Sequence, residues 1–222
     1  MALAHIYERL LSLPLFQGMS SSDLEQVIAR TKFGFIKPAR GKPVAEDGSP
    51  CRHLYILTEG TLKVECRADN GSYTLIEQMS APDVIQPESL FGFTPRFTRT
   101  FSAEASCRLM SIDKQEMLKL MATQEIFRIN LLNLICTRTQ RLAHQPFRQP
   151  PQDIRQKIIR FVAERSLRPA GKKTLYIKMD VLGRLLGESR INISRTLHAM
   201  KDDGLVDMGR NRIVVSALEK LI

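Results

Sequence analysis

The sequence predicts an α+β protein in three parts: an antiparallel β-sandwich or barrel, a long helix and a C-terminal winged helix-turn-helix. Short apolar runs separated by turn residues fill the stretch from Phe33 to Ile112. No Gly or Pro occurs from 113 to 145, as a long helix requires. Near the C-terminus, two short helical segments with a glycine joint precede a hairpin pattern. The expected domains are residues 1–112, 113–145 and 146–222.

The first 112 residues combine short helices with many strands. Residues 5–30 are expected to be helical, and Ser20 followed by Asp23 is a helix start. Asp69-Asn70-Gly71 lies between two apolar runs and is a strong hairpin signal. The clearest strand candidates are Leu54–Leu57, Leu62–Val64 and Tyr73–Ile76. Several short strands at this spacing indicate an antiparallel sheet that closes or folds into two layers.

The helix predicted over residues 113–145 is apolar on two sides. One face carries residues at alternating spacings of three and four: Ile129, Leu132, Cys136, Thr139 and Ala143. The other face carries Leu131, Leu134, Ile135 and Leu142. A helix that is apolar on two sides must be covered twice. This pattern predicts either a coiled-coil dimer seam on one face with the sheet against the other, or a fully buried core helix.

The last 77 residues follow a proline-rich linker that begins at Pro146. A helix is expected from Asp153 to about Leu167, then a short strand over Leu175–Ile177. Two helices over Met179–Leu186 and Ser189–Asp203 meet at Gly187-Glu188, and strands at Leu205–Met208 and Arg212–Val215 form a wing. This order of elements is that of a winged helix-turn-helix.

The basic charge is concentrated in this last part. The 222 residues contain 33 Lys and Arg against 23 Asp and Glu, a net charge of +10. Residues 146–222 carry 16 basic and 8 acidic residues, or +8. Nucleic acid and an anionic membrane surface are the candidate partners, beside a basic surface kept only for solubility. No apolar run approaches a membrane span and the N-terminus lacks signal-peptide features, so we expect a cytoplasmic protein without membrane contact.

The second of the two short helices has one apolar face and one basic face. Ile193, Leu197 and Met200 form the inward face. The opposite face and the first turn supply the expected DNA contacts, which are Ser189, Arg190, Ile191, Asn192, Ser194, Arg195, His198 and Lys201. Arginine can donate two hydrogen bonds to guanine in the major groove, and first-turn groups can bind phosphates. The alternative is an ordinary amphipathic helix with a solvated face.

Longer stretches of sequence resemble one family. Leu182–Gly204 (LGRLLGESRINISRTLHAMKDDG) resembles the helix-turn-helix of the catabolite-activator/fumarate–nitrate-regulator (CRP/FNR) superfamily. Leu15–Ser20 resembles the opening of these proteins, and Gly41, Gly48 and Gly60 resemble the glycine-punctuated strands of their cyclic-nucleotide-binding β-roll, a jelly roll. The resemblance implies a bacterial, non-enzymatic transcription regulator that dimerises through the 113–145 helix. Its implied partners are a palindromic double-stranded DNA operator, a second copy and RNA polymerase.

The resemblance also assigns roles within the recognition helix. Arg195 matches the family arginine that reads guanine, and Arg190 matches the base-reading arginine of the catabolite-activator branch. Ser194 matches a base-contacting serine of the fumarate–nitrate branch. The family glutamate after the Arg190 position is replaced by Ile191. Isoleucine cannot accept a hydrogen bond but can contact a thymine methyl. We therefore expect a central base pair different from those that the founding members read.

The effector pocket departs further from the family. Arg99-Thr100 stands where the family grips a cyclic phosphate, and Glu88 matches the glutamate that meets the ribose. The glycine expected before it is Pro87, which has no N–H to offer a phosphate. The Thr-Ser pair that meets adenine is also lost from the long helix. A cyclic nucleotide is thus a disfavoured effector, and a ligand-free constitutive regulator is an alternative.

Other cofactors and chemistries have little support in the sequence. The four cysteines are scattered without a Cys-x-x-Cys pair, so we expect no metal site or iron–sulfur cluster. Cys51-Arg52-His53, or Cys136 with His144, leaves haem as an open alternative. No motif for catalysis occurs, so no catalytic residue is expected. An adaptor whose helix-turn-helix contacts protein is a further alternative, distinguished by a weak dependence of binding on salt.

Overall fold

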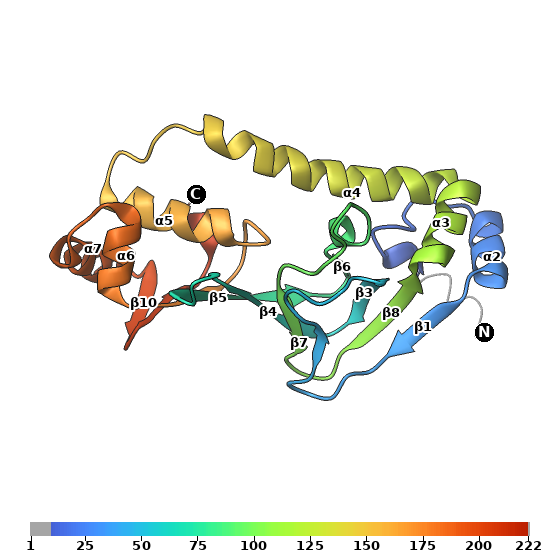
Figure 1. Ribbon diagram of the computed structural model, residues 1–222, viewed down its shortest axis with the longest axis horizontal. Helices are drawn as coiled ribbons and strands as arrows, with labels where there is room; N and C mark the ends of the chain where they lie inside the picture. The colour runs from blue at the N-terminus through green and yellow to red at the C-terminus, as the bar shows by residue number, and fades with distance from the viewer. Residues whose placement is uncertain (1–9, 222) are drawn as a thin grey trace. The chain divides into compact units, whose positions relative to one another are not determined.

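The computed structural model describes residues 10–221, so the helix expected to begin at residue 5 lies partly outside the described residues. The chain divides into two compact units (Figure 1). The first contains Met1–Leu62 and Met79–His144, and the second contains Lys63–Gln78 and Gln145–Ile222. The second unit therefore takes in a segment from the middle of the expected first domain.

The first unit is built on antiparallel strands. Its elements are α2 (Ser21–Arg30), β1 (Phe33–Ile36), β2 (Pro43–Ala45), β3 (His53–Glu59), the start of β4 (Thr61–Arg67), the end of β5 (Tyr73–Ser80), β6 (Asp83–Ile85), η1 (Pro87–Ser89), β7 (Thr100–Ala103), β8 (Arg108–Asp113), α3 (Lys114–Thr123) and α4 (Glu125–His144). One sheet has the order β1-β8-β3-β6, and β2 pairs with β7. Alternate residues of β3 enter the core, with Leu54 and Ile56 at most 1% exposed. The two-layered antiparallel architecture is as predicted.

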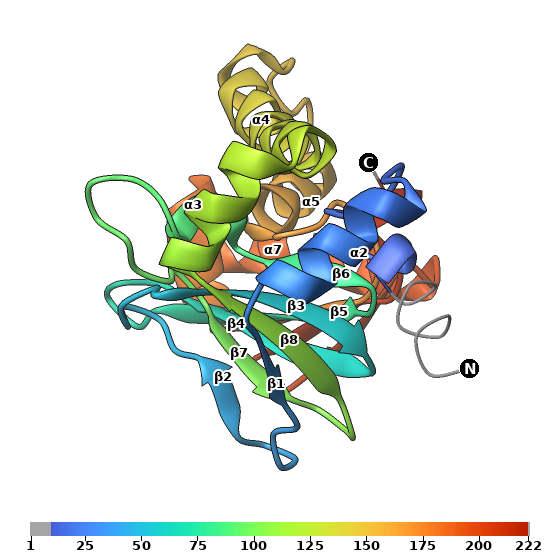
Figure 2. The same ribbon diagram turned by 90° about the vertical axis from the view of Figure 1, so that its right-hand side faces the viewer.

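Helices cover this sheet. α2 begins at the Ser20 cap, where Ser20 and Asp23 form the expected capping box. α3 packs on β8 and β3 (Figure 2). The single helix expected over 113–145 is instead two, because the chain turns at Gln124, whose backbone is extended. Arg128 stabilises the turn by donating to the carbonyl oxygen of Met121 (2.9 Å), which lies in the last turn of α3.

The second unit contains the winged arrangement predicted from the sequence. Its elements are the rest of β4 and β5, η2 (Gln145–Phe147), α5 (Ile154–Arg165), β9 (Lys173–Ile177), α6 (Met179–Leu186), α7 (Arg190–Asp202), β10 (Val206–Gly209), β11 (Arg212–Val215) and η3 (Leu218–Lys220). The helices α5, α6 and α7 share one core with the strands, centred on Phe161, Leu175, Leu182 and Leu197, each at most 4% exposed. The strand order is β10-β11-β9-β5.

Candidate nucleic-acid interface

The turn between α6 and α7 is held by backbone geometry and by packing. Gly187 ends α6 in the left-handed region (φ 67°), a conformation that glycine adopts without a steric penalty. The N–H of Glu188 donates to the carbonyl oxygen of Gly183 (2.8 Å). Lys157 of α5 then donates to the Glu188 carboxylate (2.6 Å), which ties the turn to the neighbouring helix. The recognition-type helix α7 is therefore fixed at its first turn.

The inward face of α7 is the predicted one. Ile193, Leu197 and Met200 are at most 1% exposed and lie in the core of the second unit. Burial of these side chains stabilises α7 against α5 and α6 by about 1.5–3 kcal/mol each. The packing leaves the opposite face of the helix open to solvent.

The open face gathers five of the eight residues expected to contact DNA. Together with Ala199 and Asp202, they line one hollow on the surface: Arg190, Ile191, Ser194, Arg195 and His198. Ile191 is 70% exposed, an apolar side chain among polar neighbours. Asp202 was not among the expected residues, although its four-residue spacing from His198 places both on one face.

The other three expected residues take part in the N-cap of α7 and in a contact between α7 and the wing. Ser189 is its N-cap, and its hydroxyl oxygen accepts from the backbone N–H of Asn192 (3.1 Å). Lys201 lies 3.8 Å from Asp207 of the wing, which also approaches Arg212. Lys201 therefore bridges the helix to the wing strand, and Asn192 contributes its backbone rather than its side chain to the cap.

His198 has a local partner within the helix. Its Nδ1 lies 2.7 Å from the carbonyl oxygen of Ser194, one turn earlier. In a neutral ring, Nδ1–H would donate to that carbonyl and Nε2 would be an acceptor. The ring is exposed and lines the hollow together with Arg195.

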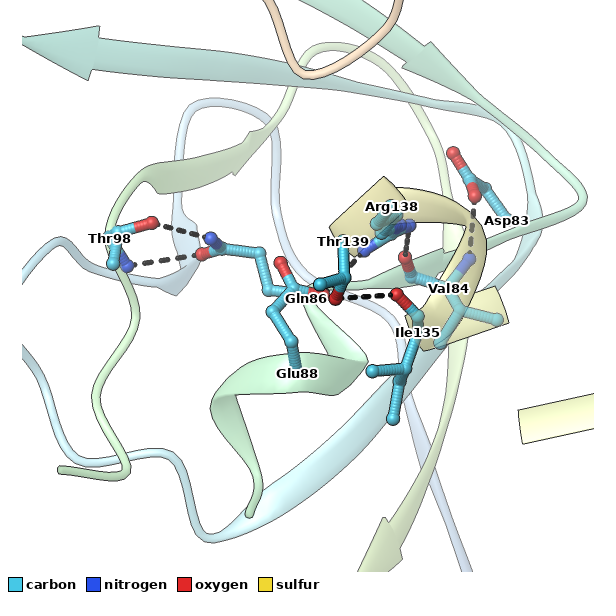
Figure 3. Close-up of polar contacts among 8 residues, drawn as sticks. All are labelled: Asp83, Val84, Gln86, Glu88, Thr98, Ile135, Arg138 and Thr139. Carbon is cyan, nitrogen blue, oxygen red and sulfur yellow. Dashed lines mark hydrogen bonds and ion pairs between the residues drawn. The ribbon is translucent and has the colours of Figure 1, made fainter. Parts of the chain in front are cut away.

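The η1 loop (residues 86–90) holds the predicted effector residue Glu88 (Figure 3). Gln86 has a left-handed backbone (φ 31°), so the position that favours glycine is Gln86 rather than Pro87. Its side chain makes two hydrogen bonds with Thr98: Nε2 donates to the hydroxyl (2.6 Å), and Oε1 accepts from the backbone N–H (3.1 Å). This pair fixes one side of the loop.

A residue of α4 fixes the other side of the η1 loop. Arg138 donates to the Glu88 carboxylate (2.9 Å) and to the carbonyl oxygen of Val84 (3.1 Å), as Figure 3 shows. The Arg138 side chain is 17% exposed and that of Glu88 is 38% exposed. Sequence reasoning missed Arg138 because it lies 50 residues from Glu88, and only its place on the inner side of α4 could have suggested it.

The remaining predicted effector residues lie at the start of β7. Thr100 accepts a hydrogen bond from the backbone N–H of Asp47 (3.1 Å), so its hydroxyl joins β7 to the turn after β2. Arg99 precedes it and is half-buried. The partners of Thr100 and Glu88 come from different elements, namely the Asp47 turn and α4.

The haem candidate at Cys51 is a buried thiol. Cys51 is 4% exposed, and its Sγ lies 3.6 Å from the carbonyl oxygen of His53. Burial and the nearby Glu88 carboxylate raise the pKa of Cys51 to about 11. Because a metal-bound or reactive cysteine needs a thiolate, these surroundings do not favour ligation by Cys51. Over residues 10–221, no cluster of three His, Cys, Asp or Glu side chains is arranged around a metal-sized site.

Two sequence families match successive parts of the chain. Residues 36–124 match the cyclic nucleotide-binding domain, and residues 156–222 match the Crp-like helix-turn-helix domain. Within the described residues, every helix is too short or too polar to span a bilayer.

Relatives with the same domain order cover nearly the whole chain. A CRP-like cAMP-activated global transcriptional regulator of Mycobacterium tuberculosis (strain H37Rv) is 24% identical over 216 residues, covering 93% of this chain and 94% of its own. The crystal structure of the Thermus thermophilus catabolite activator protein has a TM-score of 0.53 at 20% identity, covering 94% and 96% of the two chains. The sensor domain of the Pseudomonas aeruginosa regulator DNR also has a TM-score of 0.53 at 20% identity, covering 69% of this chain and all of that domain.

The likeness to the Thermus structure establishes the fold over nearly the whole chain, with a β-sandwich, a long helix and a helix-turn-helix in this order, and the likeness to the DNR sensor domain supports its N-terminal part. The fold alone does not identify the family. The two sequence families do, because a Crp-like helix-turn-helix domain follows a cyclic nucleotide-binding domain in this chain. The protein is a member of the CRP/FNR superfamily of DNA-binding transcription regulators.

Proposed function

We propose that the protein is a homodimeric, sequence-specific transcription regulator that reads one half of a palindromic operator with each α7 helix. The open face of α7 carries this proposal. Arg190 and Arg195 flank Ile191 in one exposed hollow. Arginine can donate two hydrogen bonds to the O6 and N7 atoms of guanine, and isoleucine can contact the methyl group of thymine.

The dimer is proposed to form along α4. Phe127 and Leu131 pack into the first unit and are at most 1% exposed, whereas Ile129 and Leu132 on another side are 45% and 49% exposed. A second α4 helix would cover these apolar side chains and the exposed thiol of Cys136. Mild oxidation should then give a covalent dimer through Cys136. A Cys136→Ser variant should give none, and a monomer in both cases would contradict the seam.

DNA binding is tested by selecting operators from random double-stranded DNA and measuring their affinity against salt. Each neutralised phosphate contributes a slope of about 0.9, so affinity should fall steeply between about 50 and 200 mM salt. Arg195→Ala should cost about 1–3 kcal/mol and relax the preference at one base pair. Lys220→Ala, which removes an exposed charge outside α7, is the matched control. Protein capture without DNA binding would favour the adaptor alternative.

Ile191 gives the proposal a base-specific test. If its side chain contacts a thymine methyl, replacing that thymine by deoxyuridine removes only the methyl and should weaken binding of the wild-type protein. Ile191→Glu should prefer cytosine at the same position, because a carboxylate accepts from the cytosine amino group. An unchanged half-site for Ile191→Glu would contradict this role.

A ligand-free regulator is the second candidate, and Arg138 favours it. The guanidinium binds the carboxylate of Glu88, the residue that the family resemblance assigns to a cyclic nucleotide. A thermal-shift titration with cyclic AMP tests the two candidates. A ligand at about 100 times its Kd adds roughly 2.7 kcal/mol of stability. We expect no saturable rise for the wild type, and a rise would restore the cyclic-nucleotide effector. Arg138→Met, which keeps an unbranched side chain but removes the guanidinium, tests whether the guanidinium is what excludes the nucleotide.

A further inference from the structure

The β4–β5 hairpin belongs to the second unit, here called the DNA-binding unit. In the sequence, however, it interrupts the first unit, here called the sensor unit. Residues 63–78 group with 145–222, while the residues directly before and after the hairpin group with the first unit. β5 pairs antiparallel with β9, so that Leu75 lies opposite Leu175 and Glu77 opposite Lys173. The wing sheet β10-β11-β9 thereby gains a strand from the hairpin (Figure 1).

The inner face of the hairpin completes the core of this unit. Leu75 is 1% exposed in the same cluster as Leu175 and Phe161. Tyr73 meets Phe161 edge to face, with 5.2 Å between ring centroids. Arg165 stacks on the Phe161 ring at 3.8 Å and donates through Nε to the Tyr73 hydroxyl (2.9 Å). Removal of the hairpin would therefore expose apolar surface on the DNA-binding unit.

A buried ion pair sets the register of this docking. Lys173 donates to the Glu77 carboxylate at 2.7 Å, and the two side chains are 1% and 2% exposed. Glu77 also accepts from the backbone N–H groups of Leu167 (2.6 Å) and Arg168 (3.2 Å), and Lys173 donates to the Ala170 carbonyl oxygen (2.9 Å). A shift of the strand by one residue would move Glu77 to the opposite face and leave the Lys173 charge buried alone.

The chain makes this hairpin a link between the two units. Besides the joint at residue 144, the hairpin enters from residue 62 and returns to residue 79. We propose that the docked hairpin, locked by Glu77–Lys173, is the element through which the sensor unit orients the DNA-binding unit. The hairpin pairs with β9, whereas the open face of α7 is lined by residues of α7 alone. The hairpin would therefore act by orienting α7 and not by covering it. The role of the hairpin in orientation rests on the proposed function, because it is measured by operator binding. Docking of the hairpin does not, because it is measured by cross-linking.

Docking is tested by cross-linking, which requires no destabilising substitution in the core. Thr74 and Tyr176 are register partners on the outer face of β5 and β9, and their Cβ atoms should lie about 4.5–5.5 Å apart. In a background with Cys66→Ser and Cys136→Ser, Thr74→Cys with Tyr176→Cys should form an intramolecular disulfide under mild oxidation. Ile76→Cys with Tyr176→Cys, a diagonal pair about 7–8 Å apart, is the matched control. Equal yields in the two variants, or no disulfide in either, would overturn the docking.

The role in orientation is tested with two DNAs, a full operator with two half-sites and a single half-site. Glu77→Ala leaves Lys173 buried without its partner and should lower affinity for the full operator about fivefold or more, because both α7 helices must then be positioned by binding itself. Affinity for the half-site should be unchanged. The double variant Glu77→Leu/Lys173→Met keeps the hairpin docked through apolar contacts and should bind both DNAs as the wild type does.

The other outcomes separate the possible failures. Equal loss on both DNAs would mean that Glu77 serves only the fold of the unit, and an unchanged full-operator affinity would mean that docking does not orient α7. Either result overturns the proposal. If the wild type binds neither DNA, the proposed function fails, and the disulfide yield still decides whether the hairpin docks.

Discussion

Substitution of Gly183 tests whether tight packing at the helical turn positions the recognition helix. A Cβ atom at Gly183 would lie 2.6 Å from the carbonyl oxygen of Glu188 and 3.5 Å from the backbone nitrogen of Arg190. The first distance is far below van der Waals contact, and the atom it meets is backbone that leads directly into α7. Gly183→Ala should therefore push the turn away from α6. Overpacking of this kind costs about 1–3 kcal/mol.

Thermal unfolding and half-site binding measure the two consequences. In a unit of this size, each kcal/mol lowers Tm by about 4–8 °C. Gly187→Ala is the matched control, because its Cβ would meet nothing within 4 Å and the cost is confined to the left-handed backbone (φ 67°). This variant should lose roughly 1 kcal/mol of stability and keep its half-site affinity once folded. Wild-type stability and affinity for Gly183→Ala would show that the turn has room, and the reasoning would be wrong.

Two further predictions concern ionisable groups in the first unit. Because burial and the Glu88 carboxylate raise the pKa of the Cys51 thiol to about 11, iodoacetamide at pH 8 should label Cys51 far more slowly in the folded protein than in the unfolded chain, and equal rates would contradict its burial. The backbone N–H groups of Glu116 and Gln115 lower the pKa of Asp113, the N-cap of α3. Its stabilisation is therefore present above the ordinary carboxyl pKa and lost as pH falls through the lowered folded value. Asp113→Ala should lose about 1 kcal/mol near pH 7 and unfold like the wild type at about pH 2, and a loss of the same size at both pH values would contradict the cap.

The helices and strands of both units could be predicted from the sequence because turn residues, apolar spacing and helix caps act on neighbouring residues. The turn at Asn70-Gly71 forms between β4 and β5 as expected, with Gly71 at φ 66°. The α6–turn–α7 segment follows from apolar spacing and the Gly187 cap, and the inward face of α7 is the predicted one. The hollow residues of α7 were predictable for the same reason, since helical spacing alone decides which side chains share a face.

Contacts between distant residues could not be predicted in this way. The alternation of β5 shows that Leu75 and Glu77 share a face, but not that the face packs on a strand about 100 residues later. A charged pair such as Glu77 and Lys173 also suggests a solvated surface, whereas both side chains are buried. The break between α3 and α4 at Gln124 could not be predicted, because no Gly or Pro marks it in the sequence. The break is stabilised instead by Arg128 and by the packing of both helices.

The two long-range ion pairs differ in how far each could shift a conformational equilibrium. Arg138–Glu88 is partly exposed, so solvent screening limits its contribution to about 0–1 kcal/mol. Removal of one partner from the buried Glu77–Lys173 pair costs about 3–5 kcal/mol. Moving a two-state equilibrium from 99:1 to 1:99 requires about 5.5 kcal/mol. The Arg138 contact can therefore only bias the η1 loop. The cost of breaking the Glu77–Lys173 pair approaches this figure without reaching it, so loss of one partner would shift the docking of the hairpin much further than loss of the Arg138 contact would shift the η1 loop.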